Sequence, residues 1–152
     1  MRGILGSPLK RGNSDVIEAA VYTGTMSAGV AVSMDNADDD QTTVKAFAAA
    51  IGLFGFSVAN DLNSKTKTVS VTRTGLDVPI RAATGKTFSF GDPVFIDASG
   101  MAVPDGDADA VYQVNGTVRK AEFIGLNENG TEVSAITVDL FGGGAAPAAG
   151  GA

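Results

Sequence analysis

The sequence contains no histidine, no cysteine and no tryptophan. Without histidine and cysteine, the chain can hold neither a Ser-His-Asp nor a Cys-His nucleophile pair, and it has no imidazole base. Zinc sites built from thiolate and imidazole are excluded for the same reason, and so are disulfide bonds. Catalysis would depend on carboxylate, lysine, serine or tyrosine chemistry, or on a hard metal held by oxygen ligands. We therefore expect a non-enzymatic protein with no catalytic residues, no cofactor and no metal.

Charged side chains are also scarce, at 18% of the residues, and the formal net charge is -6. An acidic surface repels phosphate, which disfavours nucleic acid as a general partner. The longest apolar stretch, residues 46–59, contains Ser57 and is shorter than the roughly 18 residues that span a bilayer. We therefore expect neither a nucleic-acid partner nor a membrane partner.

Glycine is abundant, with 20 residues, and hydrophobic residues make up 44% of the chain. This composition can bury a core and supplies many turns between short strands. Because Pro79 cannot donate a hydrogen bond, the segment around it should lie at a sheet edge. We expect one all-β domain, a small β-sandwich or barrel. Apolar and polar residues alternate between turn signals and predict strands at residues 68–73, 78–80, 88–90, 94–97, 101–103, 123–126 and 132–140.

Residues 44–51 depart from this pattern. Val44, Phe47, Ala48 and Ile51 recur at helical spacing, and Gly52 would end a helix there. One short helix beside the β body and a strand are both compatible with this segment.

The two ends of the chain differ in composition from the body at residues 15–141. Residues 1–14 carry three positive charges and no negative charge. Glycines and Pro8 interrupt any periodicity there, so we expect an extended N-terminal arm that is mobile in isolation. Residues 142–152 contain only Gly, Ala and Pro. We expect a disordered tail there, because no side chain can offset the entropy of ordering it.

The arm interleaves apolar and basic side chains. Such a segment can order in a groove of a protein neighbour or add a strand to a sheet edge. An inert terminus and a nucleic-acid tether are the alternatives, although three charges would bind phosphate weakly and with strong salt dependence. The interleaving favours a protein partner, and the candidate contact residues are Arg2, Ile4, Leu5, Leu9, Lys10 and Arg11.

Two acidic segments were considered as calcium sites. Asp35 and residues 38–40 have neither the glycine nor the downstream glutamate of a defined calcium loop. Residues 105–109 have the alternate acid spacing that begins an EF-hand, but Ala110 stands where the turn glycine belongs and Gly116 where the glutamate should be. We expect a solvated loop for the first segment and a hairpin tip for the second.

The order of motifs between residues 74 and 140 resembles the cement, or head decoration, proteins of tailed bacteriophages. In that family a short V-x-L/I-P strand leads to a small-residue turn. An aromatic residue with GD-x-V-x-x-D, a glycine turn, a hydrophobic-I/L-G strand and a valine-rich closing strand follow. The resemblance covers about half of the chain; residues 1–14, 36–41 and 105–116 have no counterpart in it. The matching positions are residues 78–80, 90–94, Asp97, Gly100, 123–125 and 136–140.

This resemblance implies a virion protein that binds the exterior of an assembled phage head. It would clamp adjacent subunits of the major capsid protein against internal DNA pressure, and we expect a homo-oligomer, with a trimer favoured. The candidate arm residues then become candidates for contact with the capsid. A carbohydrate-binding β-module is the alternative from another class. Sugar sites usually stack rings on exposed aromatic side chains, and here Tyr22 and Tyr112 are the only tyrosines in a chain without tryptophan.

Overall fold

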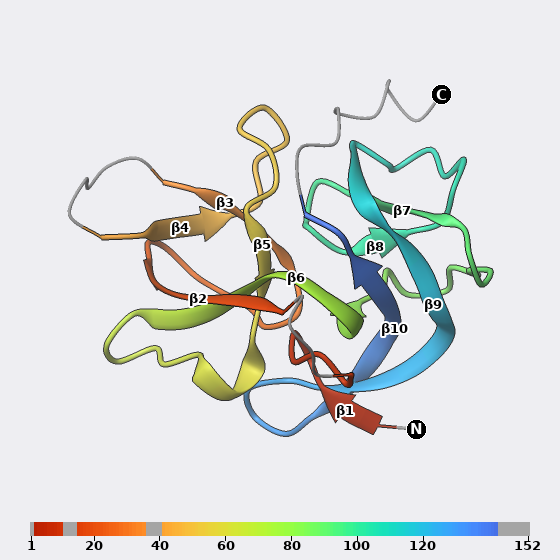
Figure 1. Cartoon of the computed structure of the whole chain (residues 1–152). Coiled ribbons are helices and arrows are strands. Elements are labelled where there is room, and N and C mark those ends of the chain that lie inside the picture. Colours follow the sequence, from red (N-terminus) through yellow and green to blue (C-terminus); the bar gives the residue numbers. More distant parts are fainter. Residues whose placement is uncertain (1, 11–14, 36–40, 143–152) are drawn as a thin grey trace.

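The computed structural model describes residues 2–10, 15–35 and 41–142. These residues form ten strands and one short 3-10 helix, η1 (Figure 1). The all-β fold expected from the sequence is confirmed. The elements are β1 Arg2–Ile4, β2 Val16–Tyr22, β3 Ala31–Met34, β4 Thr43–Ala46, β5 Gly55–Ser57, η1 Ala59–Asp61, β6 Thr68–Arg81, β7 Pro93–Ile96, β8 Ala102–Val103, β9 Tyr112–Leu126 and β10 Glu132–Leu140.

Five strands close into a small ring, which we call the first barrel. They pair in the order β2-β4-β3-β5-β6, and β6 pairs again with β2. The β2–β4 pair is parallel, and the other pairs of the ring are antiparallel. Among the described residues, closure gives each of these five strands a partner on both sides. The barrel encloses a cluster of buried side chains: Ala20, Tyr22, Met26, Val32, Val44, Val69 and Val71.

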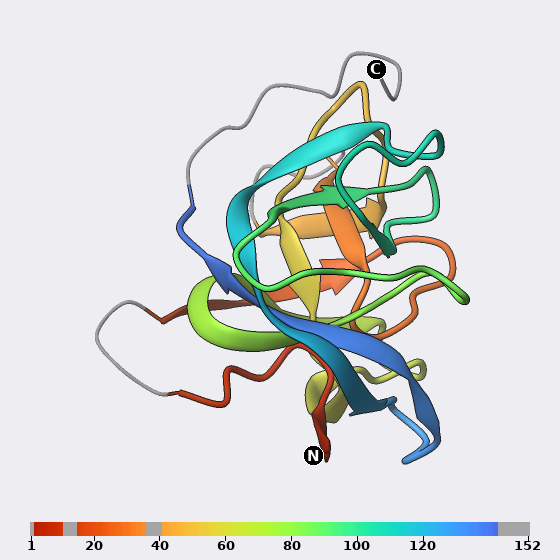
Figure 2. The same cartoon turned by 90° about the vertical axis from the view of Figure 1, so that its right-hand side faces the viewer.

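The later strands form a second, strongly curved sheet, which we call the second barrel. Residues 75–81 of β6 pair with β10, and β9, β7 and β8 follow in that order. An isolated parallel bridge between Ala82 and Ala102 brings β8 back to the end of β6. This sheet surrounds the larger core, which includes Val78, Ile80 and Ile136. Figure 2 shows β9 and β10 as a long curved pair along this half.

Strand β6 belongs to both barrels. Its first half, residues 68–74, pairs with β2 and β5, and its second half pairs with β10. Val69 and Val71 are buried in the first core, whereas Val78 and Ile80 are buried in the second. One long strand with two apolar faces therefore joins the two barrels, and Figure 1 shows it passing between them.

Residues 2–10 are extended at β1, as the sequence predicted, but they pack on the body and do not form an arm that is mobile in isolation. Strand β1 pairs in parallel with residues 124–126 of β9. Farther along, the Gly6 N–H donates to the Pro79 carbonyl at 2.7 Å, and the Leu9 N–H donates to the Asp77 carbonyl at 3.0 Å. Glycine and proline interrupt the side-chain periodicity of this segment, but its backbone groups still find partners on the body. The remaining residues of the predicted arm, Met1 and 11–14, lie outside the described residues, as do residues 143–152 of the predicted tail.

Of the two alternatives for residues 44–51, the strand forms, as β4 at Thr43–Ala46, and a turn at residues 49–51 takes the place of a helix. Two local predictions differ from the structure. Residues 78–80 are not a separate edge strand but part of β6. Pro79 lies opposite Thr137 of β10 on one side of β6. On the other side its carbonyl accepts a hydrogen bond from the Gly6 N–H, so residue 79 needs no N–H of its own there. Residues 88–90 form a loop that buries Phe88 and exposes Phe90.

Candidate functional site

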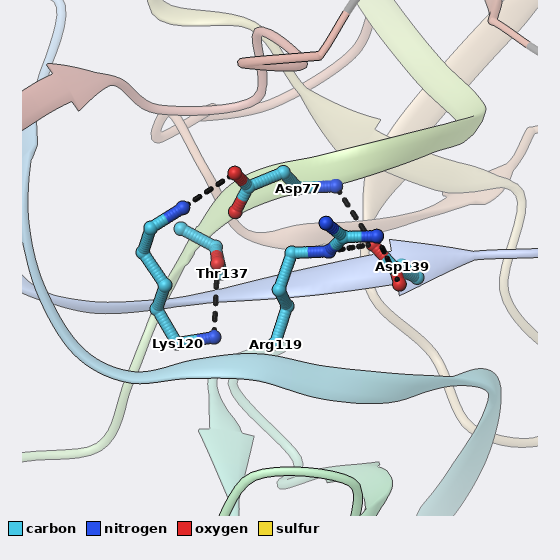
Figure 3. Close-up of polar contacts among 5 residues, drawn as sticks. All are labelled: Asp77, Arg119, Lys120, Thr137 and Asp139. Atoms are coloured by element: carbon cyan, nitrogen blue, oxygen red, sulfur yellow. Dashed lines mark hydrogen bonds and ion pairs between the residues drawn. The ribbon is translucent and has the colours of Figure 1, made fainter.

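Two carboxylates and two basic side chains meet where β6, β9 and β10 lie side by side (Figure 3). Lys120 Nζ donates to Asp77 Oδ2. Arg119 binds Asp139 at two points, with Nε 2.8 Å from Oδ1 and Nη2 3.0 Å from Oδ2. The backbone N–H of Asp77 donates to Asp139 Oδ1 at 2.9 Å and so joins the two ion pairs. The backbone N–H of Lys120 donates to the Thr137 hydroxyl oxygen at 3.1 Å.

Irregularities in the three strands bring these groups together. The register of β10 against β9 shifts on both sides of Thr137, and its register against β6 shifts between Val138 and Leu140. Asp77 has a φ of 57°, in the left-handed region that aspartate and asparagine tolerate better than most side chains. Such bulges redirect side chains out of the regular alternation, which is why a strand pattern alone did not predict this network.

Asp77 is 2% exposed, and this burial raises the pKa of its carboxyl. The hydrogen bonds from Lys120 and Thr137, with the charges of Lys120 and Arg119, together outweigh burial and hold the pKa of Asp77 below its ordinary 3.8. The hydrogen bond to Asp139 raises the pKa of Arg119. Each carboxylate in the network is paired with a basic side chain. This arrangement is suited to holding three strands together rather than to transferring protons.

Three of the six predicted contact residues lie at the surface. The Arg2 side chain is 63% exposed and forms an ion pair with Glu132, with Nε 3.2 Å from Oε2. Leu9 is 37% exposed, and Lys10 is exposed and bridges to Leu76 in β6. These side chains are available for contact with a partner, and their role in such a contact stays a prediction.

The other three candidates are placed differently. Ile4 is half-buried and packs against a small core cluster. Leu5 is fully buried in that cluster, so it cannot reach a capsid while the chain is folded. The burial of Leu5 depends on Gly125, because a Cβ there would collide with the leucine side chain. Arg11 lies outside the described residues.

A groove of about 390 Å³ separates the two barrels near the start of β9 and the end of β10. Val16, Phe54 and Arg73 line it from the first barrel, and Val114 and Leu140 line it from the second. The backbone closes one end, since the Phe141 N–H donates to the Asn115 carbonyl at 3.0 Å. Local sequence patterns did not predict this groove, because its walls come from five separate segments.

Arg73 is the charged side chain in the wall of this groove. Its guanidinium lies over the Phe54 ring, 4.2 Å from the centroid, and its Nε donates to the Phe54 carbonyl at 3.2 Å. Val16 pairs with Thr74, whereas Ile17 pairs with Thr72, so Arg73 is the extra residue of a bulge in β6. In the sequence, Arg73 has the position of the last residue in a regular alternating strand, and this pattern does not indicate the bulge.

The acidic segment between β8 and β9 has turns at residues 105–106 and 108–109, but it is not the hairpin tip that the sequence predicted, because β8 and β9 both pair with β7 and not with each other. Asp107 accepts a bond from Lys86 at 2.8 Å and one from the Asp109 N–H at 2.8 Å. The hydrogen bond from Lys86 lowers the pKa of Asp107. Within the described residues, no group of three or more His, Cys, Asp or Glu side chains could hold a metal ion. Residues 36–40 of the other acidic segment lie outside the described part of the chain.

The two tyrosines considered for sugar stacking are both buried, with Tyr22 5% and Tyr112 7% exposed. The large exposed aromatic side chains in the described ranges are instead Phe90, at 79%, and Phe141, at 57%. In the same ranges, no helix has the length and apolar character needed to cross a membrane.

Comparison with solved structures shows a similar fold in one phage capsid chain and a weaker match to a second phage chain. A chain from "The capsid of Myoviridae Phage XM1" superposes with a TM-score of 0.65 at 12% sequence identity, covering 91% of this chain and 89% of that chain. A chain from "The crystal structure of head fiber gp8.5 N base in bacteriophage phi29" gives a TM-score of 0.47 at 17% identity, covering 83% of this chain and 93% of that chain. No protein-family model and no curated protein matches the sequence. At 12% identity the XM1 likeness shows a shared fold, which by itself does not assign a function.

Proposed function

We propose that this chain is a structural protein of a tailed-phage head, which binds the exterior of the assembled shell and cements adjacent subunits of the major capsid protein. The observation that carries the proposal is the fold shared with a chain of the XM1 capsid, over nearly the full length of both chains. The resemblance of residues 74–140 to head decoration proteins is a second, sequence-based support.

The proposed activity is binding without turnover. The shared strand β6 joins the two barrels, and the Asp77–Lys120 and Arg119–Asp139 pairs hold β6, β9 and β10 of the second barrel together, so that the body can transmit load between its contacts. A standard protein contact buries about 800 Å² per partner, and a homo-oligomer, with a trimer favoured, would multiply several such contacts through effective concentration. The net charge of -6 favours a protein partner over packaged DNA, because an acidic surface repels phosphate.

Co-sedimentation tests the binding step. Purified protein is mixed with heads of the phage that encodes it, prepared from a strain in which its gene is deleted. We expect saturable pelleting with the heads and none in tubes without heads. Protein that stays in the supernatant at every head concentration would rule out the proposal.

Heating the same heads tests the cementing step. If the chain clamps neighbouring subunits, heads saturated with it should release DNA at a higher temperature than undecorated heads, as read with a DNA-binding dye. Heads that bind the protein but release DNA at an unchanged temperature would leave a head-surface protein without a cementing role.

A further inference from the structure

We infer that the groove between the two barrels is the seat for an extended segment of the shell protein, which inserts an apolar side chain beside an acidic one. This inference rests on the proposed function. It adds which surface of this chain binds the shell and which side chains the bound segment of the shell protein carries. It follows from three properties of the groove: its exposed apolar rim, its single cation and its size.

The rim carries large apolar side chains that the folded chain leaves in water. Val16 lines the groove and is 47% exposed. Leu53 and Phe54 also line the groove, and both are half-buried. Exposed apolar side chains around a concave surface are typical of the anchoring centre of a protein interface.

The charge of the groove is opposite to that of the protein as a whole. The chain has a net charge of -6, yet the charged residue in the groove wall is Arg73. The Phe54 ring and the bulge in β6 fix the guanidinium in place. Glu18 lies 3.8 Å from Nη1, which is longer than a hydrogen bond, so Arg73 retains donors for a partner carboxylate.

The size of the groove limits the shape of its occupant. A volume of about 390 Å³ is near the lower end for ligand pockets and accommodates one or two side chains rather than a helix. The chain's own residues 143–152 continue from the rim at Gly142, but they contain only Gly, Ala and Pro and have no acidic side chain to match Arg73. A segment of the shell protein with an apolar and an acidic side chain meets both requirements.

Two neighbouring residues of β2 provide a matched test. Val16 lines the groove, whereas Ile17 is 38% exposed and does not line it. In the co-sedimentation assay we expect Val16→Asp to weaken head binding at least tenfold, because it places a competing carboxylate beside Arg73. The control Ile17→Asp should remain within twofold of the unmodified chain.

The outcomes separate this inference from the proposed function. Binding of the Val16→Asp protein at full strength, while the unmodified chain also binds, would refute the groove as the docking surface and leave the head-binding role intact. Failure of the unmodified chain to bind would remove both. If Val16→Asp prevents folding, as judged by circular dichroism, Arg73→Gln provides the same test. It should weaken binding at least fivefold and reduce its dependence on salt, whereas unchanged affinity and salt dependence would overturn the inference.

Photo-crosslinking identifies the occupant directly. The full chain is prepared with benzoylphenylalanine in place of Val16 or Ile17, bound to heads and irradiated. We expect an adduct with the shell protein from position 16 and much less from position 17. An adduct of position 16 with residues 143–152 of the same chain, or with a second copy of the chain, would contradict the inference.

Discussion

The two barrels meet at two junctions, one filled and one open. At the filled junction, Leu5 inserts between Ala28 and Ala59 of the first barrel and Phe123 and Ala135 of the second. The open junction is the groove beside Val16. No side chain of the described residues fills this groove in the way that Leu5 fills the other junction. We therefore expect the filled junction to contribute to folding stability, and we propose the open junction as the docking surface.

Glycines show how closely the filled junction is fitted. A Cβ at Gly29 would lie 2.8 Å from the Leu5 Cβ, and a Cβ at Gly125 would collide with the Leu5 side chain. At the open junction, Gly55 instead permits close approach within the first barrel, where a Cβ would lie 2.5 Å from Val71 Cγ1. Small residues thus make room for Leu5 at one junction but do not close the groove at the other.

The largest expected effect comes from emptying the filled junction. Leu5→Ala removes a fully buried side chain from between two barrels that are fixed by their own hydrogen bonds and cannot collapse around the space. We expect a loss of about 3–5 kcal/mol in the free energy of unfolding, measured by urea denaturation.

Leu9 offers the matched control for this change. It belongs to the same segment and is the same residue type, but it is 37% exposed. Leu9→Ala should cost less than about 1 kcal/mol. A loss for Leu5→Ala as small as that for Leu9→Ala would mean that residues 2–10 contribute little to the stability of the folded chain. That result would support the mobile arm that the sequence predicted.

A smaller effect is expected from the ion-pair network next to the filled junction, to which the Leu9 N–H is bonded through the Asp77 carbonyl. Asp77→Asn keeps a residue that tolerates the left-handed backbone but removes the charge that Lys120 neutralises. Because the Lys120 side chain is 29% exposed and can turn toward water, we expect a loss of about 1–3 kcal/mol at pH 7.

This loss should depend on pH in a defined direction. Folding lowers the pKa of Asp77 from 3.8, so the unfolded chain binds the proton more readily than the folded chain. The stabilisation by the carboxylate is complete above that pKa and is lost as the pH falls through the lower, folded pKa. The difference between the unmodified chain and Asp77→Asn should therefore be constant from pH 7 to 5 and shrink below 3.8. A difference that persists or widens in acid would contradict the assignment.

The sequence predicted the parts of the fold that depend on local alternation. Residues 132–140 form β10 with the predicted bounds, and β7 and β8 lie within one residue of their predicted positions. It failed where pairing depends on distant segments. Nothing in the sequence of residues 2–4 indicates a parallel partner at residues 124–126. The all-β class was therefore predictable, whereas the double-barrel topology was not.

The residues of the candidate site show the same difference between features that local sequence predicts and features that depend on distant segments. Composition identified exposed basic residues in the first ten positions, and Arg2 and Lys10 are indeed at the surface. It placed Leu5 in the same group, because a leucine in this glycine-interrupted segment has no periodic apolar neighbours that would mark it as core. The role of Arg73 was missed because its position in a bulge depends on how β6 pairs with β2, a strand that is distant in the sequence.

The smallest effect on stability is expected at the outer edge of the filled junction, where Arg2 pairs with Glu132. Their side chains are 63% and 45% exposed, so water screens the attraction. We expect Arg2→Gln to change the free energy of unfolding by less than about 1 kcal/mol. The same variant tests Arg2 as a capsid contact, because its binding to heads can change without a change in folding. Lys65→Gln, which removes an equal charge from an exposed loop of the first barrel, is the control. If Arg2 contacts the shell, Arg2→Gln should bind more weakly than Lys65→Gln, whereas equal binding by the two variants would leave the groove, rather than β1, as the attachment surface.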